Sequence, residues 1–339
     1  MERLRPSINP ESVTTPPKLR IGLRGVAGQL GSRICDAVNR QPDMTTTLGL
    51  DKIGQTVKTR AFGLKPANPE TEFIFLDQDD PSIEQRIPTD VDVFIDATPP
   101  GVASRYAETY SAYNIPVIVQ SGDRTFPHIA SPPRITENTT VIRQGDCNIS
   151  GLTPVLSALG EIVERVQLTV LMQYGSSLRD KPRNTRLHTI ELRPSTELSE
   201  DLQQLFPDVD FVVRQITQTP GLQYYEHIID LITTVSVDKD DIYELLNRHP
   251  RIKCMPDVRS SFPVDEGGEM LRLRGKNQPP ITPLTLMTQQ YDSKHIVLYV
   301  LIDSRWVTVY PNVDLARILG LGTAPLDAMK KTDKAMNFV

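Results

Sequence analysis

The chain has 339 residues, 39% of them hydrophobic and 23% charged, which is typical of a folded globular protein and excludes disordered and fibrous classes. Its formal charge of −5 gives no general attraction to nucleic acid or anionic membranes. No apolar run approaches the roughly 20 residues that span a bilayer, and the first residues lack a signal-peptide pattern. Three cysteines are too few for a disulfide framework. We therefore expect a cytoplasmic protein of about two domains.

The first half of the chain alternates between strand and helix patterns. Residues 1–17 are polar, contain several prolines and are expected to be a flexible extension. Strands are predicted at 19–23, 45–50, 72–76, 91–95, 116–119 and 141–143, with helices at 32–40 and 104–113. Such alternation is typical of the α/β class with a doubly wound parallel sheet of the Rossmann type. Residues 18–146, together with a C-terminal helical region 313–339, are predicted to form a dinucleotide-binding domain.

The pattern changes after Cys147, where apolar residues from Leu152 to Val166 recur at three- and four-residue spacing and indicate the strongest amphipathic helix of the sequence. Ser150 is predicted to cap this helix and Pro154 to lie in its first turn. Further strands are expected at 167–173, 211–216, 225–235, 284–290 and 295–309, with helices at 239–248, 313–319 and 325–335. Strands in runs favour a mostly antiparallel sheet, so residues 147–312 are predicted to form an α+β catalytic domain.

A glycine-rich turn joins the first predicted strand to the first helix. Its spacing is G-x-x-G-x-x-G, with Val26 where the usual dinucleotide fingerprint has its first glycine, and Gly25 opens the turn one residue earlier. The predicted cofactor-binding residues of this turn are Gly25, Val26, Ala27, Gly28, Gln29, Leu30 and Gly31. Glycines let the backbone approach a pyrophosphate, which the helix N-terminus favours electrostatically. The alternative is a loop that merely turns a strand into a helix.

Two further features bear on the cofactor. Asp51 follows the second predicted strand, twenty residues after Gly31, where a carboxylate binds a ribose 2′-hydroxyl and repels a 2′-phosphate. This favours NAD, although NADP stays open because Lys52 lies beside it. Thr98 and Gly101 follow a strongly apolar strand and are predicted nicotinamide-side contacts, with a simple Pro-Gly turn as the alternative.

Cys147 is the candidate nucleophile. It stands between a predicted strand and the amphipathic helix, where the helix dipole and backbone N–H groups lower the pKa of a thiol. Asn148 offers an amide donor to an oxyanion, whereas the charge of Asp146 opposes thiolate formation. Cys35 and Cys254 are expected to be buried small hydrophobic residues. A purely structural role is the alternative for Cys147.

Five motifs resemble those of type II, archaeal-type, glyceraldehyde-3-phosphate dehydrogenase. They are Gly28-Gln29-Leu30-Gly31-Ser32-Arg33, Asp92-Val93-Phe94-Ile95-Asp96-Ala97-Thr98-Pro99, Gln120-Ser121-Gly122-Asp123, Asp146-Cys147-Asn148-Ile149-Ser150-Gly151-Leu152 and Lys330-Lys331-Thr332-Asp333-Lys334. The resemblance covers residues 18–339 and is strongest up to residue 158. It implies a homo-oligomer, a tetramer or dimer, that acts on a small-molecule aldehyde or acyl compound.

The resemblance also implies a mechanism. A cysteine thiolate attacks an aldehyde to give a hemithioacetal, hydride passes to the nicotinamide, and phosphate or water releases the acyl group from the resulting thioester. The catalytic base maps to His227, with His188 as the second choice. Tyr225 stands where the family has the first histidine of an M-H-x-H motif. Gly122 falls in the cofactor turn and Ser150 in the substrate site.

The chain departs from the family where the substrate phosphates are bound. A paired-arginine motif is replaced by Ser176-Ser177-Leu178-Arg179-Asp180, and Ile149 stands in place of a threonine. Arg179, Arg183 and Arg186 offer another anion site, with a solvated basic loop as the alternative. These departures favour the same chemistry on a variant aldehyde or acyl compound.

Two other functions stay open. One is a noncatalytic nucleotide-binding or interaction protein on the same fold, which the missing substrate motifs favour. The other is an NAD(P)-dependent reductase that acts without a covalent intermediate, using the G-x-x-G-x-x-G loop. Reaction direction and pathway are not determined by the sequence.

Overall fold

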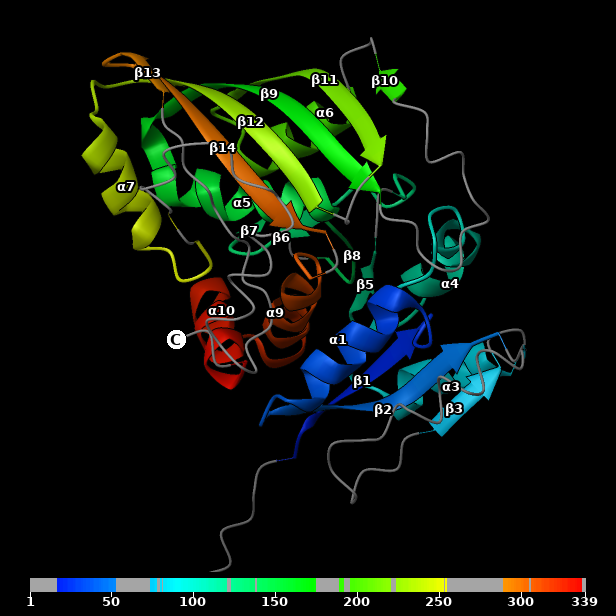
Figure 1. Cartoon of the computed structure of the whole chain (residues 1–339). Helices are drawn as coiled ribbons and strands as arrows, with labels where there is room; N and C mark the ends of the chain where they lie inside the picture. Colours follow the sequence, from blue (N-terminus) through cyan, green and yellow to red (C-terminus); the bar gives the residue numbers. More distant parts are fainter. Residues whose placement is uncertain are drawn as a thin grey trace, which may run out of the picture.

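The protein is described from a computed structural model. The described residues are 17–52, 74–77, 80, 82–120, 123–137, 139–174, 189–191, 196–220, 224–252, 254, 289–304 and 306–336. They form two sheets with helices between and around them (Figure 1). Among these residues no helix combines the length and apolarity needed to cross a membrane.

The first sheet has the strand order β3-β2-β1-β4-β5-β8-β6-β7, and all neighbouring strands are parallel except β6 and β7. Its strands are β1 (Leu19–Arg24), β2 (Met44–Asp51), β3 (Ile74–Asp77), β4 (Val93–Asp96), β5 (Val117–Val119), β6 (Ile129–Ser131), β7 (Arg134–Ile135) and β8 (Val141–Gln144). Helices pack on both faces, which confirms the doubly wound Rossmann-type class.

One face of this sheet carries α1 (Gln29–Asn39) and the C-terminal helices α9 (Val309–Leu321) and α10 (Pro325–Ala335) (Figure 1). The other face carries α3 (Ile83–Asp90), the 3-10 turn η1 (Ala103–Tyr106) and α4 (Ala107–Ser111). Apolar side chains from strands and helices form a separate core on each face. The C-terminal helices therefore pack with the N-terminal half of the chain.

The second sheet has the order β10-β11-β9-β12-β14-β13 and is antiparallel except between β9 and β11, as the sequence predicts. Its strands are β9 (Val163–Tyr174), β10 (Thr189–Glu191), β11 (Asp210–Pro220), β12 (Tyr224–Thr233), β13 (Gln289–Asp292) and β14 (His295–Asp303). Helices α5 (Cys147–Leu159), α6 (Thr196–Leu205) and α7 (Lys239–Asn247) cover the face toward the first sheet (Figure 1), and the turn η2 (Gly160–Ile162) follows α5. The division into domains 18–146 with 313–339 and 147–312 stays a prediction.

The start of α5 differs from the expectation. Asp146, not Ser150, caps the helix, since its carboxylate accepts the N–H of Ile149 at 2.9 Å. The Ser150 hydroxyl instead donates to the carbonyl of Gly145. Pro154 lies inside the helix rather than in its first turn. The predictions for Ser150 and Pro154 were both wrong because the helix begins at Cys147, four residues before Gly151.

The predicted strand 295–309 is also too long. The strand β14 ends at Asp303, whose carbonyl accepts the N–H groups of Trp306 and Val307 in a turn that leads to α9. Apolar residues continue through this turn, so hydropathy alone gave no boundary. Residues 284–288 of another predicted strand lie outside the described residues.

Helix α5 packs closely on β14 because Gly151 has no side chain. A Cβ at this position would lie 2.0 Å from the Cδ1 atom of Ile302, well inside van der Waals contact. The close approach fixes the distance between the start of α5 and the second sheet.

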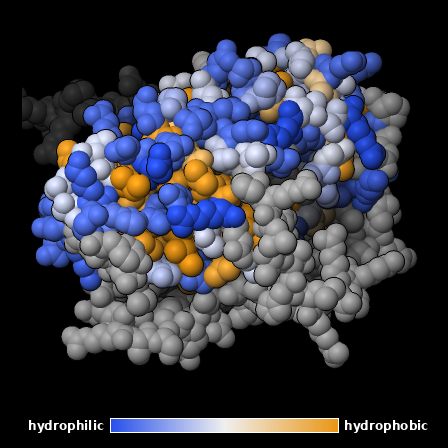
Figure 2. Space-filling view, turned by 90° about the horizontal axis from the view of Figure 1, so that it is seen from above, coloured by the Kyte–Doolittle hydropathy of each residue, from blue (hydrophilic) through white to orange (hydrophobic). Residues whose placement is uncertain are grey.

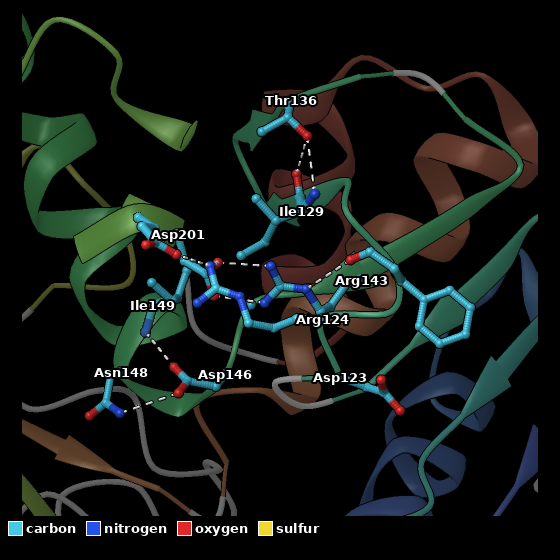
Figure 3. Close-up of polar contacts among 12 residues, drawn as sticks. Asp123, Arg124, Ile129, Thr136, Arg143, Asp146, Asn148, Ile149 and Asp201 are labelled. Carbon is cyan, nitrogen blue, oxygen red and sulfur yellow. Dashed lines mark hydrogen bonds and ion pairs between the residues drawn. The ribbon is translucent and has the colours of Figure 1, made fainter. Parts of the chain in front are cut away.

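A buried ion pair ties the first sheet to α6. Arg143, at the end of β8, donates two hydrogen bonds to Asp201, at 2.7 and 2.8 Å, and is 2% exposed. Arg124 also reaches Asp201, at 3.1 Å (Figure 3). Paired donors of this kind satisfy a buried carboxylate that would otherwise be costly.

Removal of this carboxylate should destabilise the protein strongly. We expect Asp201→Ala to lower the free energy of unfolding by about 3–5 kcal/mol, because it leaves Arg143 buried without its counter-charge. The matched control is Asp210→Ala, which breaks the exposed Arg165–Asp210 pair and should cost less than about 1 kcal/mol. Denaturant unfolding of both variants measures the difference, and equal losses would contradict the assignment.

Candidate active site

The glycine turn has the geometry of a phosphate-binding loop. Gly25 has a φ of +75° and donates its N–H to the carbonyl of Leu50. Gly28 precedes α1, which begins at Gln29 rather than at residue 32. A Cβ on Gly31 would lie 2.1 Å from the Gly25 carbonyl oxygen, so the helix can start this close to the turn only with glycine there. The first N–H groups of α1, which lack intrahelical acceptors, lie at the carboxyl edge of the sheet.

Asp51 lies beside this turn at the end of β2. One carboxylate oxygen accepts the N–H of Ala27 at 2.9 Å and the other accepts the N–H of Lys52 at 2.8 Å. The carboxylate is thereby held next to the loop whose backbone approaches the ribose and pyrophosphate of a dinucleotide. The turn, the helix start and this carboxylate together fit such a cofactor.

The loop after β4 is held by its own side chains. Thr98 donates both its N–H and its hydroxyl to Asp96, at 2.9 and 2.5 Å, and Tyr110 donates to the same carboxylate. Thr98 thus supports the loop, and its contact with a nicotinamide stays a prediction. Gly101 has a φ of +79° in this loop. After β5, the side-chain amide of Gln120 donates a hydrogen bond to Asn312 of α9 at 2.5 Å. This buried amide pair lies at the same edge of the sheet, and the sequence analysis did not predict it as part of the site.

Cys147 is the first residue of α5 and is half-buried against the core that α5 forms with the second sheet. Burial and the neighbouring charge of Asp146 raise the pKa of the Cys147 thiol to about 12. The Tyr225 hydroxyl and the N–H groups of Cys147 and Asn148 act in the opposite direction and lower this pKa. The predicted donors at the helix start are therefore present, but the prediction of a lowered pKa was wrong because desolvation outweighs them.

A chain of hydrogen bonds connects Asp146 to His227 through Asn148. The Asn148 amide nitrogen donates to Asp146, at 3.3 Å, and its oxygen lies 3.0 Å from Nε2 of His227. Figure 3 shows Asn148 and Ile149 converging on the Asp146 carboxylate. Because a carboxylate is an acceptor, the amide oxygen must face the imidazole, and Nε2 must carry the hydrogen. The basic nitrogen of His227 is then Nδ1.

His227 is buried on β12 and is uncharged. Burial lowers its pKa to about 3. Nδ1 has no hydrogen-bond partner among the described residues. The site thus combines a neutral thiol with a neutral imidazole, and the described contacts of His227 lead to Asn148 rather than to the sulfur.

Several predicted residues cannot be placed. Gly122, Arg179, Arg183, Arg186 and His188 lie outside the described residues. The Ser150 side chain is buried in the first turn of α5, where its hydroxyl forms hydrogen bonds with Gly145 and Gln144. Cys35 is buried as expected and Cys254 is partly buried. The described part of the chain contains no cluster of three metal-binding side chains.

Comparison with known proteins supports the sequence resemblance. Residues 19–122 match the family described as dihydrodipicolinate reductase, N-terminus. The glyceraldehyde-3-phosphate dehydrogenase of Haloarcula marismortui is 24% identical, over 94% of this chain and 94% of its own length. The enzyme of the same name from Halobacterium salinarum is 28% identical, over 76% of this chain and 82% of its own length.

The fold has a counterpart among solved structures. Aspartate semialdehyde dehydrogenase II from Vibrio cholerae superposes with a TM-score of 0.65, covering 89% of this chain and 98% of that chain at 11% identity. At this identity the likeness concerns the fold alone. It agrees with a Rossmann-type domain followed by a second, mostly antiparallel sheet.

The buried state of His227 predicts a pH dependence of stability. An imidazole with a folded pKa of about 3 and an ordinary unfolded value near 6.5 binds fewer protons when folded, so its contribution to stability is lost as pH falls below 6.5. We expect the wild type to lose up to about 1.4 kcal/mol more per pH unit than His227→Gln between about pH 6 and 4. Urea unfolding at several pH values tests this. His249 titrates in both proteins, so identical slopes would mean that His227 is not buried as described.

Proposed function

Since the chain is a divergent relative of the archaeal glyceraldehyde-3-phosphate dehydrogenases and an NAD(P)-dependent dehydrogenase by class, we propose that it interconverts an aldehyde and an acyl compound through a covalent bond to Cys147. The observation that carries this proposal is the position of Cys147. It starts α5 and is followed by Asn148, whose side-chain oxygen lies 3.0 Å from Nε2 of His227. Catalysis by a nucleophile needs such a group beside proton-transferring side chains.

In the proposed reaction, each of the following residues has a separate role. The Gly28–Gly31 turn binds the pyrophosphate through N–H groups, and Asp51 accepts a ribose hydroxyl. These residues would hold a nicotinamide cofactor at this edge, and the chemistry that it would supply is hydride transfer. The Cys147 sulfur adds to the substrate carbonyl, and Asn148 has a second amide hydrogen for the oxygen that gains charge. Burial keeps Nδ1 of His227 unprotonated. This nitrogen can therefore accept a proton from the water molecule or other nucleophile that releases the acyl group.

The carboxylate of Asp51 leads us to propose NAD as the cofactor. We expect NADP to bind at least about tenfold more weakly, because its 2′-phosphate would face Asp51. Asp51→Asn keeps an oxygen for the Ala27 N–H but removes the charge, so it should narrow this difference. Titration of both cofactors by calorimetry measures it. An unchanged preference in Asp51→Asn would assign selectivity to another residue.

The substrate is proposed to be a variant aldehyde rather than glyceraldehyde 3-phosphate. The chain lacks the paired-arginine motif and has Ile149, fully buried, where the family has a threonine. An apolar side chain in that position offers no hydrogen bond to a phosphate. Arg179, Arg183 and Arg186 are proposed to bind an anionic group of the substrate.

A second candidate is a reductase that transfers hydride without a covalent intermediate. Two observations favour it: the Cys147 thiol is neutral in the free protein, and residues 19–122 match a reductase domain. In this case Cys147 has only a packing role, and the substrate is an electrophile other than an aldehyde.

We also propose a homo-oligomer. The described helices cover only one face of the second sheet, and Figure 2, seen from above the molecule of Figure 1, shows an apolar area on the opposite face. Strand register places Ile228 and Ile232 of β12, Leu171 of β9 and Tyr299 of β14 on that face, each partly exposed. An apolar surface of this kind is typical of subunit contacts.

The covalent mechanism predicts that Cys147→Ala abolishes turnover. We expect a loss of at least about 10³-fold in aldehyde-dependent reduction of NAD, because no other described group replaces the nucleophile. The assay is NADH absorbance with a panel of phosphorylated, acidic and neutral aldehydes.

Cys35→Ala is the matched control, since this buried cysteine lies in α1 away from the site, and it should keep activity. Full turnover in Cys147→Ala would support the reductase without a covalent intermediate. Binding of NAD with no turnover in the wild type would support a noncatalytic protein.

A further inference from the structure

Arg24 is a fully buried charged residue next to the glycine turn. It is the last residue of β1 and directly precedes Gly25. Its side chain lies on the face of the sheet that carries α3, η1 and α4, where the central guanidinium carbon is 3.9 Å from the centre of the Tyr106 ring. A buried charge is costly unless it is paired and hydrogen-bonded, so the partners of this side chain indicate what it does.

The guanidinium has two polar partners on that face. Its Nη2 atom forms an ion pair with Glu84 of α3, and its Nη1 atom donates to the Tyr110 hydroxyl of α4 at 2.6 Å. Glu84 also accepts a hydrogen bond from the Tyr113 hydroxyl, at 2.5 Å. A guanidinium can only donate, so the Tyr110 oxygen is the acceptor here and the Tyr110 hydrogen is available for another partner.

That partner is Asp96, the last residue of β4. The Tyr110 hydroxyl donates to one carboxylate oxygen at 2.5 Å, and the other oxygen accepts both the N–H and the hydroxyl of Thr98. Burial and the charge of Asp96 raise the pKa of Tyr110, so its hydroxyl stays protonated and donates. A chain of hydrogen bonds therefore runs from Arg24 through Tyr110 and Asp96 to the loop after β4.

This loop lies directly against the glycine turn. The N–H of Ala97 donates to the carbonyl of Arg24 at 2.9 Å. A Cβ on Gly25 would lie 2.9 Å from the Ala97 carbonyl oxygen and 3.2 Å from the Thr98 nitrogen. Since the two backbones are in contact, a displacement of the loop changes the space between the turn and the residues from Thr98 to Gly101.

We propose that Arg24 is a positioning residue of the cofactor site, which acts through Tyr110 and Asp96 on the loop that contacts the nicotinamide half of the dinucleotide. This inference rests on the proposed cofactor contacts of the glycine turn and of Thr98 and Gly101. A buried ion pair adds little stability over well-packed apolar side chains, so the main effect of this network is on position. A loop that is already held in place needs no ordering when the cofactor binds, which strengthens binding.

Tyr110→Phe tests this chain of hydrogen bonds at its middle, since it removes only the hydroxyl that joins Arg24 to Asp96. We expect the Kd of NAD, measured by titration calorimetry, to rise at least about tenfold, because the loop then populates its binding-competent position only in part. The Kd of ADP, which has the adenine half and the diphosphate but no nicotinamide, should change by less than about twofold on the same reasoning. A general loss of structure would weaken both ligands, so the difference between them reports on the loop.

Tyr113→Phe is the matched control. It removes a phenol hydroxyl from the same network, but this hydroxyl donates to Glu84, on the branch that does not lead to Asp96. Its Kd values for NAD and ADP should both stay within about twofold of those of the wild type, because the loop keeps its position.

Each result decides a different point. Equal losses of NAD and ADP affinity in Tyr110→Phe, unchanged NAD affinity there, or an equal loss of NAD affinity in Tyr113→Phe would overturn the role of Arg24 and leave the cofactor site in place. A wild-type protein that does not bind NAD would instead remove the proposed cofactor site, and the inference with it.

Thermal unfolding checks that each variant is folded. If Tyr110→Phe does not fold, Glu84→Gln decides, since it removes the charge that holds Arg24 and its side chain is partly exposed. A rise in the Kd of NAD without a matching rise for ADP supports the proposal, and unchanged NAD affinity overturns it.

Discussion

The carboxylate of Asp146 is the interaction on which the candidate site depends. It caps α5 through Ile149 and orients Asn148, which in turn fixes the tautomer of His227. The same charge raises the pKa of the Cys147 thiol that follows it. One residue thus orders the helix start and opposes thiolate formation there, so the site is built around a neutral thiol.

In the proposed mechanism, this arrangement gives the second sheet a part in the chemistry. A helix start alone would favour a thiolate, but Cys147 packs against the core between α5 and the second sheet and is partly buried there. Desolvation then outweighs the effect of the helix start on the thiol pKa, so the proposed covalent mechanism requires side chains that move a proton during the reaction. The glycine turn of the first sheet and the start of α5 belong to strand-to-helix turns at the carboxyl edge, where α/β folds bind ligands.

The sequence predicts the architecture well because the patterns that define strands, helices and turns lie within short segments of the chain. Alternation and glycine placement identify β1, the turn at Gly25 and the mostly antiparallel second sheet, and the helix 325–335 has the bounds expected. Two acceptable capping residues, Asp146 and Ser150, lie four apart, and periodicity cannot choose between them. The thiol pKa depends on the distance between α5 and the sheet, which Gly151 and Ile302 set through tertiary packing. No pattern within one segment contains that distance.

Acid quenching during turnover is the most direct test of a covalent role for Cys147. The protein is mixed with NAD and an accepted aldehyde, stopped in acid within the first turnover, digested and examined by mass spectrometry. A thioester predicts that the Cys147 peptide gains the mass of the acyl group in an amount close to the NADH formed. Formation of NADH with an unmodified Cys147 peptide would contradict the account.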